Sequence, residues 1–252
     1  MPSAYLLVSH GSRDPRPEVA MQQLAGMICN KELNQLQNTA NGGVASPPKC
    51  ETIVDVAYLE LNVEPLHEQI RQFGKRAFAC GCDRLKILPL FLLPGVHVME
   101  DIPAEVALAQ KALGEDIKVD LQAYLGSHPG LERLLAKQMA AVNTEAWIII
   151  SHGSRRPGSR ESVEATASNL GAVAAYWAVT PSLESRVQGL VTAGCRQIAI
   201  LPYFLFAGGI TDAIAQLVEK VQLQFPAVNF QMVEPLGASA ELADLIWDLI
   251  RE

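Results

Sequence analysis

Short apolar runs alternate along this chain with longer segments whose apolar residues have helical spacing. The apolar runs are rich in Val, Ile and Leu and lie near Tyr5–Ser9, Thr52–Leu59, Arg84–Leu90 and Ile117–Tyr124. Continuous runs of this length are typical of strands that are covered on both faces. The segments with helical spacing predict helices near Pro17–Leu33, Pro65–Phe78, Pro103–Leu113 and Pro129–Val142. Alternating strands and helices predict an α/β fold with parallel sheets and right-handed crossovers.

The second half of the chain repeats the first, because three segments recur in the same order. The matched pairs are Leu6–Arg13 with Ile148–Arg155, Gly81–Leu92 with Gly194–Leu205, and Leu125-Gly126 with Leu236-Gly237. The second half accordingly has predicted strands near Trp147–Ser151, Gln197–Pro202 and Asn229–Glu234. Ordered self-similarity of this kind indicates an internal duplication. We therefore predict two tandem parallel-sheet βα domains, at residues 1–143 and 144–252.

The copies differ in length, and the excess in the first copy lies largely around Gln37–Cys50. Its Gly, Asn and Pro content is typical of a loop. We favour a surface insertion over a lid for this segment.

Composition narrows the class of protein. The chain has a net charge of -7 and no basic block, so nucleic acid and anionic membranes are poor candidate partners. It has no apolar run long enough to span a membrane and no signal peptide, which favours a cytoplasmic protein. We expect the five cysteines to be reduced thiols. We interpret Cys80-Gly81-Cys82 as packing at a helix-to-strand turn rather than as a metal or redox pair.

Three residues that can bind a metal ion follow predicted strands of the first copy. His10 follows the first strand, Glu60 ends the second, and His97 lies just past the third. Ligands of open parallel sheets bind beyond the carboxyl ends of the strands, so all three side chains should lie at one rim. Two imidazoles and a carboxylate can hold a divalent first-row metal and leave positions open for substrate.

Each of these residues also has a plainer interpretation. A histidine in a loop is usually solvated or hydrogen-bonded to backbone, and Glu60 could be an ordinary surface carboxylate. Two further histidines look structural: we expect His67, at a helix start, to be exposed, and His128 to serve the entry into the next helix.

The second copy acts as an internal control for the metal site. It keeps His152, but Ile210 stands at the position of His97, and Ala175–Ala178 at the position of Glu60 contains no carboxylate. Ser239 replaces His128. The sequence therefore predicts a metal site in the first copy alone.

Arginines lie near both rims: Arg13, Arg16, Arg155 and Arg156. They could bind carboxylates with two hydrogen bonds each, or be ordinary solvated side chains. A phosphate-cradling loop is not expected, because the chain has neither a Gly-x-Gly-x-x-Gly nor a Walker lysine motif.

At these residues the sequence resembles the class II tetrapyrrole chelatases, in particular the sirohydrochlorin chelatases of siroheme and cobalamin synthesis. The matching segments contain His10 to Arg13, Ala57 to Glu60, Leu88 to His97 with the following Glu100 to Pro103, and Leu125 to Pro129. They span the first copy, and the second copy resembles the same family with a degraded motif, as in its long, two-domain members.

This resemblance implies insertion of Fe2+ or Co2+ into sirohydrochlorin without ATP or an organic cofactor. It implies that His10 and His97 hold the metal, that Glu60 assists, and that Ser12, Arg13 and Arg155 bind the carboxylate-rich substrate. The chain lacks the His-rich tail and cysteine cluster of some cobalt-specific members, which favours iron and siroheme. A monomer or a homodimer is expected.

Other functions remain open from the residues themselves. A cobalt or nickel chelatase would use the same fold, and a metal carrier would bind the ion without a tetrapyrrole. A phosphate-handling enzyme built on a phosphorylated His10 is disfavoured, because only Arg13 and Arg16 supply positive charge nearby.

Overall fold

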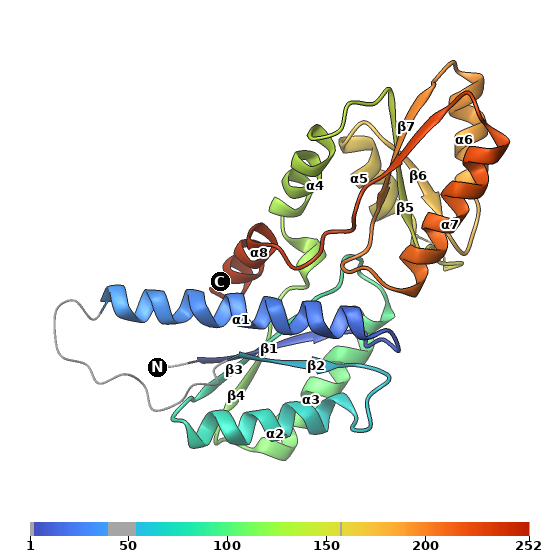
Figure 1. Ribbon diagram of the computed structural model, residues 1–252. Coiled ribbons are helices and arrows are strands. Elements are labelled where there is room, and N and C mark those ends of the chain that lie inside the picture. The colour runs from blue at the N-terminus through green and yellow to red at the C-terminus, as the bar shows by residue number, and fades with distance from the viewer. Residues whose placement is uncertain (1–2, 40–53, 157, 252) are drawn as a thin grey trace. The chain divides into compact units, whose positions relative to one another are not determined.

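The computed structural model describes residues 3–39, 54–156 and 158–251. In this part of the chain, the strands form two four-stranded parallel sheets with the orders β2-β1-β3-β4 and β6-β5-β7-β8 (Figure 1). The predicted α/β class, with two duplicated parallel-sheet domains, is confirmed.

The first sheet consists of β1 (Ser3–Ser9), β2 (Val54–Tyr58), β3 (Arg84–Pro89) and β4 (Lys118–Leu121). Its helical segments are α1 (Pro15–Thr39), α2 (Leu66–Ala79), the π-helical turn η1 (His97–Asp101), α3 (Ile102–Leu113) and the short 3-10 helix η2 (Leu125–Ser127). α4 (Gly130–Ala140) follows. The prediction of α1 was too short, because this helix continues to Thr39. The rest of the Gln37–Cys50 insertion, and the beginning of the strand predicted from Thr52, lie outside the described residues.

The second sheet consists of β5 (Ala146–Ser151), β6 (Val173–Tyr176), β7 (Gln197–Pro202) and β8 (Asn229–Met232). Its helices are α5 (Glu161–Asn169), α6 (Leu183–Thr192) and α7 (Gly209–Gln224), and α8 (Ala240–Arg251) ends the chain.

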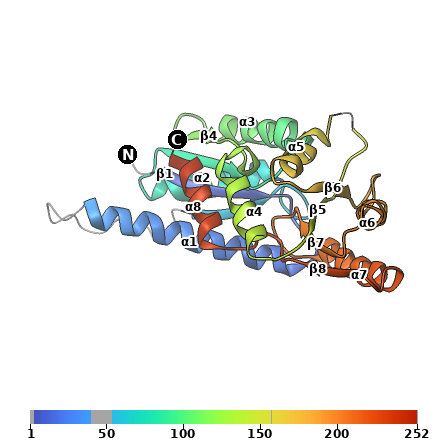
Figure 2. The same cartoon turned by 90° about the horizontal axis from the view of Figure 1, so that it is seen from above.

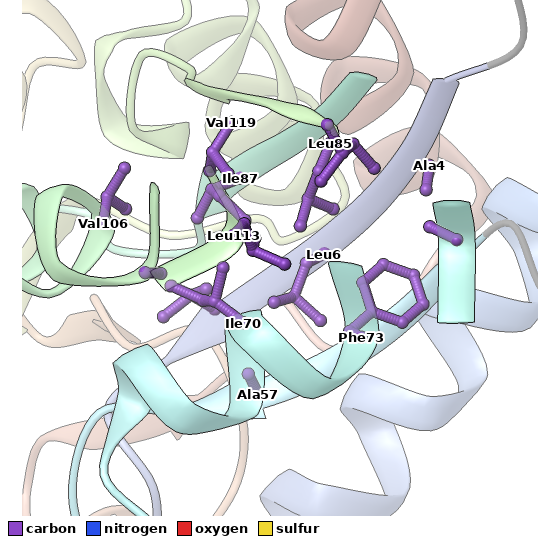
Figure 3. Packing of buried hydrophobic residues seen from close by; sticks show 14 of the residues in the cluster. Ala4, Leu6, Ala57, Ile70, Phe73, Leu85, Ile87, Val106, Leu113 and Val119 are labelled. Atoms are coloured by element: carbon purple, nitrogen blue, oxygen red, sulfur yellow. The ribbon is translucent and has the colours of Figure 1, made fainter. Parts of the chain in front are cut away.

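The central strand β1 is buried on both faces, as its continuous apolar sequence predicts. Ala4, Leu6 and Val8 belong to a core that includes Ile70 of α2 and Val106 of α3 (Figure 3). Figure 1 shows α1 on the opposite face of the sheet from α2 and α3. Helices on both faces leave the carboxyl ends of the strands as the accessible rim.

The chain divides into compact units that differ from the predicted domains of residues 1–143 and 144–252. One unit contains residues 1–128 and 238–252, and the other contains residues 129–237. The last helix of each repeat thus belongs to the unit of the other repeat: α8 packs with the first sheet and α4 with the second.

Within the first unit, α8 lies beside α1 on the same sheet face (Figure 2). The ring of Trp247 meets Tyr5 of β1 edge-on, with centroids 6.1 Å apart. Lys86 Nζ of β3 donates a hydrogen bond to the backbone carbonyl of Ile250. Lys31 of α1 forms an ion pair with Asp244 of α8. α8 is therefore part of the core of this unit.

Within the second unit, α4 occupies the corresponding place. Met139 of α4 lines one hollow together with Trp147 of β5 and Leu170, which follows α5. Asn169 Nδ2 donates a hydrogen bond to Glu132 of α4 over 3.1 Å. The opposite face of this sheet is covered by α6 and α7 through Val187, Ile214 and other apolar residues.

The cysteines only partly match expectation. Cys82 is free and buried in the core beyond the turn at Gly81, as the packing interpretation predicts. Cys80 is disulfide-bonded, so the expectation of reduced thiols is wrong for this residue. Within the described part of the chain, no helix is long and apolar enough to cross a membrane.

Candidate metal centre

The candidate site lies where the strand order of the first sheet reverses direction. From β1 the chain moves to β2 on one side, and β3 then pairs with β1 on the other. Such a switch point opens a crevice at the carboxyl ends of the two central strands. His10 follows β1 and His97 follows the loop after β3, so the topology brings these histidines to that crevice.

The structure brings together the three residues that the sequence singled out. Ligand atoms of His10, Glu60 and His97 all lie within 4.8 Å of one another. His10 Nε2 lies 3.7 Å from Glu60 Oε2, and both side chains are about half exposed, at 48% and 50%. The two imidazole rings meet edge to face with centroids 4.9 Å apart. This geometry leaves the donors able to converge on one ion from the solvent side.

Hydrogen bonds orient both imidazoles. His97 Nδ1 lies 2.8 Å from Asp101 Oδ2, and His10 Nδ1 lies 3.3 Å from the Gly11 carbonyl oxygen. An acceptor beside Nδ1 favours the tautomer that carries its proton there. The Nε2 atoms of both rings are then the unprotonated atoms that can bind a metal.

Glu60 is held against His10 through the backbone. Leu59 and Glu60 donate hydrogen bonds to the carbonyl oxygens of Ser9 and His10, which extends the β1–β2 pairing beyond the strands. Gly11 has a φ of +97°, and a Cβ at this position would lie 2.1 Å from the Glu60 carbonyl oxygen. Only glycine therefore allows the loop after β1 to lie against Glu60.

The residue after Glu60 has an unusual backbone. Leu61 has a φ of 59° and its side chain is exposed. A branched residue in this conformation is strained, and such strain is concentrated at functional sites.

Tyr58, near this loop, is not a candidate base. Burial raises the pKa of its phenol to about 12, so the phenol stays protonated.

Two of the predicted substrate-binding residues lie just beyond His10. Ser12 Oγ accepts a hydrogen bond from the backbone N–H of Asp14, which gives it a local role at the start of α1. Hydrogen bonds from Arg16 lower the pKa of the Asp14 carboxyl to about 2, so Arg16 is already paired. Arg13 is exposed and has no ion pair with any described residue.

At the rim of the second sheet, the turn after β5 has the same backbone hydrogen bonds as the turn after β1, but Ile210 stands in place of His97 and no carboxylate stands in place of Glu60. Trp177 and Ala178 donate hydrogen bonds to the carbonyl oxygens of Ser151 and His152, as Leu59 and Glu60 do in the first copy. Ile210 and Trp177 are partly exposed at this rim. Among the described residues, the first rim holds the one group of three or more potential metal ligands. The third predicted substrate-binding residue, Arg155, is exposed in this second unit.

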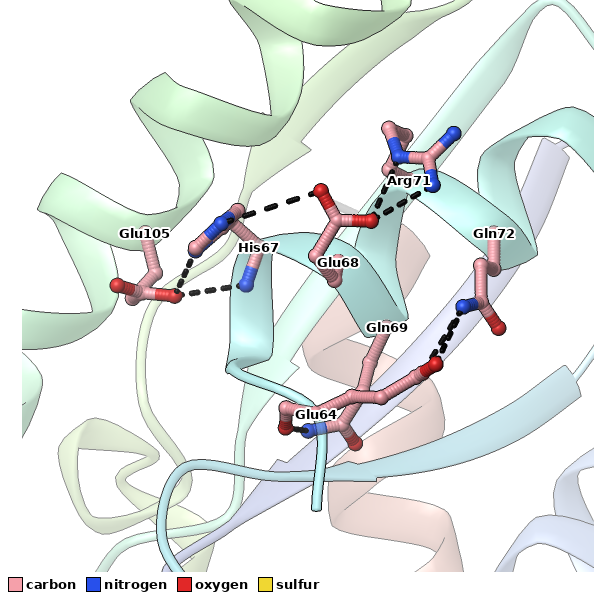
Figure 4. Close-up of polar contacts among 7 residues, drawn as sticks. All are labelled: Glu64, His67, Glu68, Gln69, Arg71, Gln72 and Glu105. Carbon is pink, nitrogen blue, oxygen red and sulfur yellow. Dashed lines mark hydrogen bonds and ion pairs between the residues drawn. The ribbon is translucent and has the colours of Figure 1, made fainter. Parts of the chain in front are cut away.

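The remaining histidines of the first unit have structural partners. The prediction that His67 is exposed was wrong, because its side chain is only 28% exposed. Glu105 Oε2 accepts hydrogen bonds from the His67 backbone N–H over 2.7 Å and from Nδ1 over 2.8 Å (Figure 4). Glu105 belongs to α3 and so links it to the first turn of α2. His128 is buried, with Nε2 3.9 Å from Asp248 of α8.

Comparison with known proteins agrees with this fold. The CbiX family model matches residues 4–142 and 146–252, so the chain belongs to the CbiX family. The two stretches are separated by residues 143–145.

Two curated relatives come from Priestia megaterium. The chain is 23% identical to a sirohydrochlorin ferrochelatase over 84% of each chain. It is 20% identical to a sirohydrochlorin cobaltochelatase over 98% of this chain and 78% of the relative. Among solved structures, SirB from Bacillus subtilis with Fe3+ has a TM-score of 0.73 at 20% identity, covering 100% of this chain and 95% of that one. At 20% identity, the similarity to the solved structure supports the fold alone.

Proposed function

We propose that this protein inserts a divalent metal ion into sirohydrochlorin without ATP. The observation that carries this proposal is the group of His10, Glu60 and His97, whose donors lie within 4.8 Å of one another at an accessible rim. Membership of the CbiX family and the names of the two curated relatives support the choice of substrate.

The donor set suits a metal that must be delivered rather than kept. Two imidazoles and one carboxylate leave coordination positions open, into which the pyrrole nitrogens of the macrocycle can enter. Histidine and carboxylate ligands suit the first-row divalent metals. Sites that retain a metal for structure are closed by four protein ligands, which this group does not supply.

Metal insertion also requires the loss of two pyrrole N–H protons, and the site supplies a base. Glu60 lies 3.7 Å from His10 and is half exposed, so its carboxylate can accept a proton and release it to solvent. His10 and His97, as neutral imidazoles, hold the metal while this occurs.

Arginines can orient the substrate through its peripheral carboxylates. Arg13 is exposed close to His10 in the chain and free of ion pairs with described residues, and we assign it this role first. Ser12 and Arg155 are further candidates for the same contacts.

We place Fe2+ first as the metal, which would give siroheme. One of the two curated relatives, 23% identical to this chain, is a sirohydrochlorin ferrochelatase. Co2+ is the second candidate, since one of the two curated relatives is a cobaltochelatase. A metal carrier without chelatase activity is a different class of function that the same donors would serve.

The test is anaerobic mixing of the protein with sirohydrochlorin and Fe2+ or Co2+, followed by the visible spectrum. Insertion should proceed faster than in the protein-free control, and a rate equal to that control with both ions would refute the enzyme. Metal binding without insertion would identify a carrier.

A matched set of variants locates the site. His10→Ala and His97→Ala should each abolish insertion, because each removes a metal ligand. His152→Ala changes the same turn in the second copy and should leave most of the activity. An equal loss in the His152 variant would contradict a single site.

A further inference from the structure

We propose that Asp101 is a positioning residue for His97. We further propose that Asp101 reaches this position because the first copy of the repeat has one residue more at this turn than the second copy. Asp101 would fix the imidazole so that Nε2 faces the metal. This inference rests on the proposed function, because it assigns a role within the same metal site.

The contact itself is direct. Asp101 Oδ2 accepts a hydrogen bond from His97 Nδ1 over 2.8 Å, and both side chains are partly exposed. His97 also packs against two other rings, those of His10 at 4.9 Å and Phe91 at 6.2 Å between centroids. Ring packing restrains the plane of the imidazole, but it does not distinguish one nitrogen from the other. The carboxylate makes that distinction, because it selects the nitrogen that bears the proton.

The backbone around this pair is also unusual. His97–Asp101 forms the π-helical turn η1, which leads directly into α3. A π-helical turn arises when a helix accommodates one extra residue, and such turns are frequent at functional sites. The duplication allows this explanation to be checked against the second copy.

The register of the two copies changes by one residue at this turn. Buried Val98 and buried Thr211 are 113 positions apart, the same offset as Pro89 and Pro202 at the ends of β3 and β7. Beyond the turn, buried Ile102 corresponds to Ile214, at an offset of 112.

The offset of 112 then persists along the helix. Val106 and Ala109 of α3 correspond to Val218 and Val221 of α7, and all four side chains are buried. The first copy therefore has one residue more between its buried positions 98 and 102 than the second copy has between 211 and 214. The second copy enters α7 directly at Gly209 as an α-helix.

The extra residue and the histidine occur together. The residue before Ile102 is Asp101, whereas the residue before Ile214 is Ala213. His97 itself corresponds to Ile210, which has no ring to orient. The copy with the metal ligands thus has the turn and the carboxylate, and the copy without them has a regular helix start. If the π-helical turn served only the fold, it would be expected in both copies, whether or not the histidine is present.

The experiment compares Asp101→Ala with Glu100→Ala, which removes the neighbouring exposed carboxylate of the same turn. Co2+ alone is titrated into each full-length protein, and affinity and the visible Co2+ spectrum are recorded. Loss of a partner that orients a metal ligand typically costs about 10- to 100-fold in metal affinity, which we expect for Asp101→Ala. Glu100→Ala should match the wild type. Asp101→Asn keeps an acceptor of the same shape and should fall between them.

Wild-type affinity and an unchanged Co2+ spectrum in Asp101→Ala would overturn the proposal. A second measurement needs no variant: NMR chemical shifts of the His97 ring nitrogens in the metal-free protein should show the proton on Nδ1, and a proton on Nε2 would equally overturn it. Failure of the wild type to metallate sirohydrochlorin, with Co2+ binding intact, would refute the proposed enzyme but leave the Asp101 effect on affinity measurable.

Discussion

Replacing Gly11 with alanine tests whether the turn after β1 positions the residues of the candidate metal site. Gly11 has a φ of +97°, and an added Cβ would lie 2.1 Å from the carbonyl oxygen of Glu60. The obstacle is backbone, which cannot move aside as a flexible side chain can. Either the Glu60 backbone or the loop after His10 must therefore shift.

The geometry gives the expected size of two losses, one in stability and one in the rate of metal insertion. An alanine in this conformation costs on the order of 1–3 kcal/mol of stability. Real Cβ atoms essentially never lie closer than 3.0 Å to such an atom, so the backbone at residue 11 and the Glu60 carbonyl oxygen must move apart by about 0.9 Å. A misplacement of about 1 Å in a catalytic arrangement can cost about 100-fold in rate. We expect a loss of this order in metal insertion by Gly11→Ala.

The matched control is Gly153→Ala, which changes the same turn of the second copy. Gly153 also has a positive φ, and its added Cβ would meet the side chains of Val179 and Tyr176 at 2.7 and 2.8 Å. This variant should lose stability in thermal unfolding but keep its Co2+ affinity and insertion rate. If Gly11→Ala retained wild-type insertion, or if both variants lost it equally, the reasoning from the Gly11–Glu60 approach would be refuted.

Three further predictions concern other parts of the chain. Trp247→Ala should destabilise the protein by about 3–5 kcal/mol in denaturant unfolding, because it removes a large side chain packed on Tyr5, and a change below ~1 kcal/mol would contradict the placement of α8. Glu105→Ala should cost about 1–3 kcal/mol by leaving two donors of His67 unpaired, while Co2+ affinity stays unchanged; a loss of affinity would show that this contact serves the metal site. Arg13→Ala should raise the KM for sirohydrochlorin about 10-fold through a lost charged hydrogen bond and leave Co2+ affinity unchanged, and an unaltered KM would remove Arg13 from the substrate site.

Local patterns were sufficient to predict the fold class and the grouping of His10, Glu60 and His97. The apolar runs identified strands covered on both faces, and the repeat established that one pattern is used twice. Because parallel strands present their carboxyl ends at one rim, the positions of His10, Glu60 and His97 just after strands already predicted that they would meet. The loss of two of the three residues from the second copy could be read directly from Ile210 and from Ala175–Ala178, which contains no carboxylate.

Other features depend on contacts between segments far apart in the chain. Nothing in the sequence around Gly11 shows that its Cα lies against the Glu60 carbonyl. The partner of His67 was missed for the same reason, since Glu105 is in another helix. The pairing of His97 with Asp101 had a weak signal in its four-residue spacing, but the π-helical turn became apparent only when the buried positions of the two copies were compared.

The domain assignment shows most clearly what local sequence patterns cannot predict. The repeats divide near residue 143, but α4 and α8 each pack in the unit of the other repeat. An apolar stripe such as that of Leu242, Ile246 and Ile250 requires a helix to be covered, and any sheet face with apolar side chains meets that requirement. Both duplicated sheets offer such a face. Which sheet each helix covers is decided by the packing of the whole chain, through contacts such as Trp247 with Tyr5.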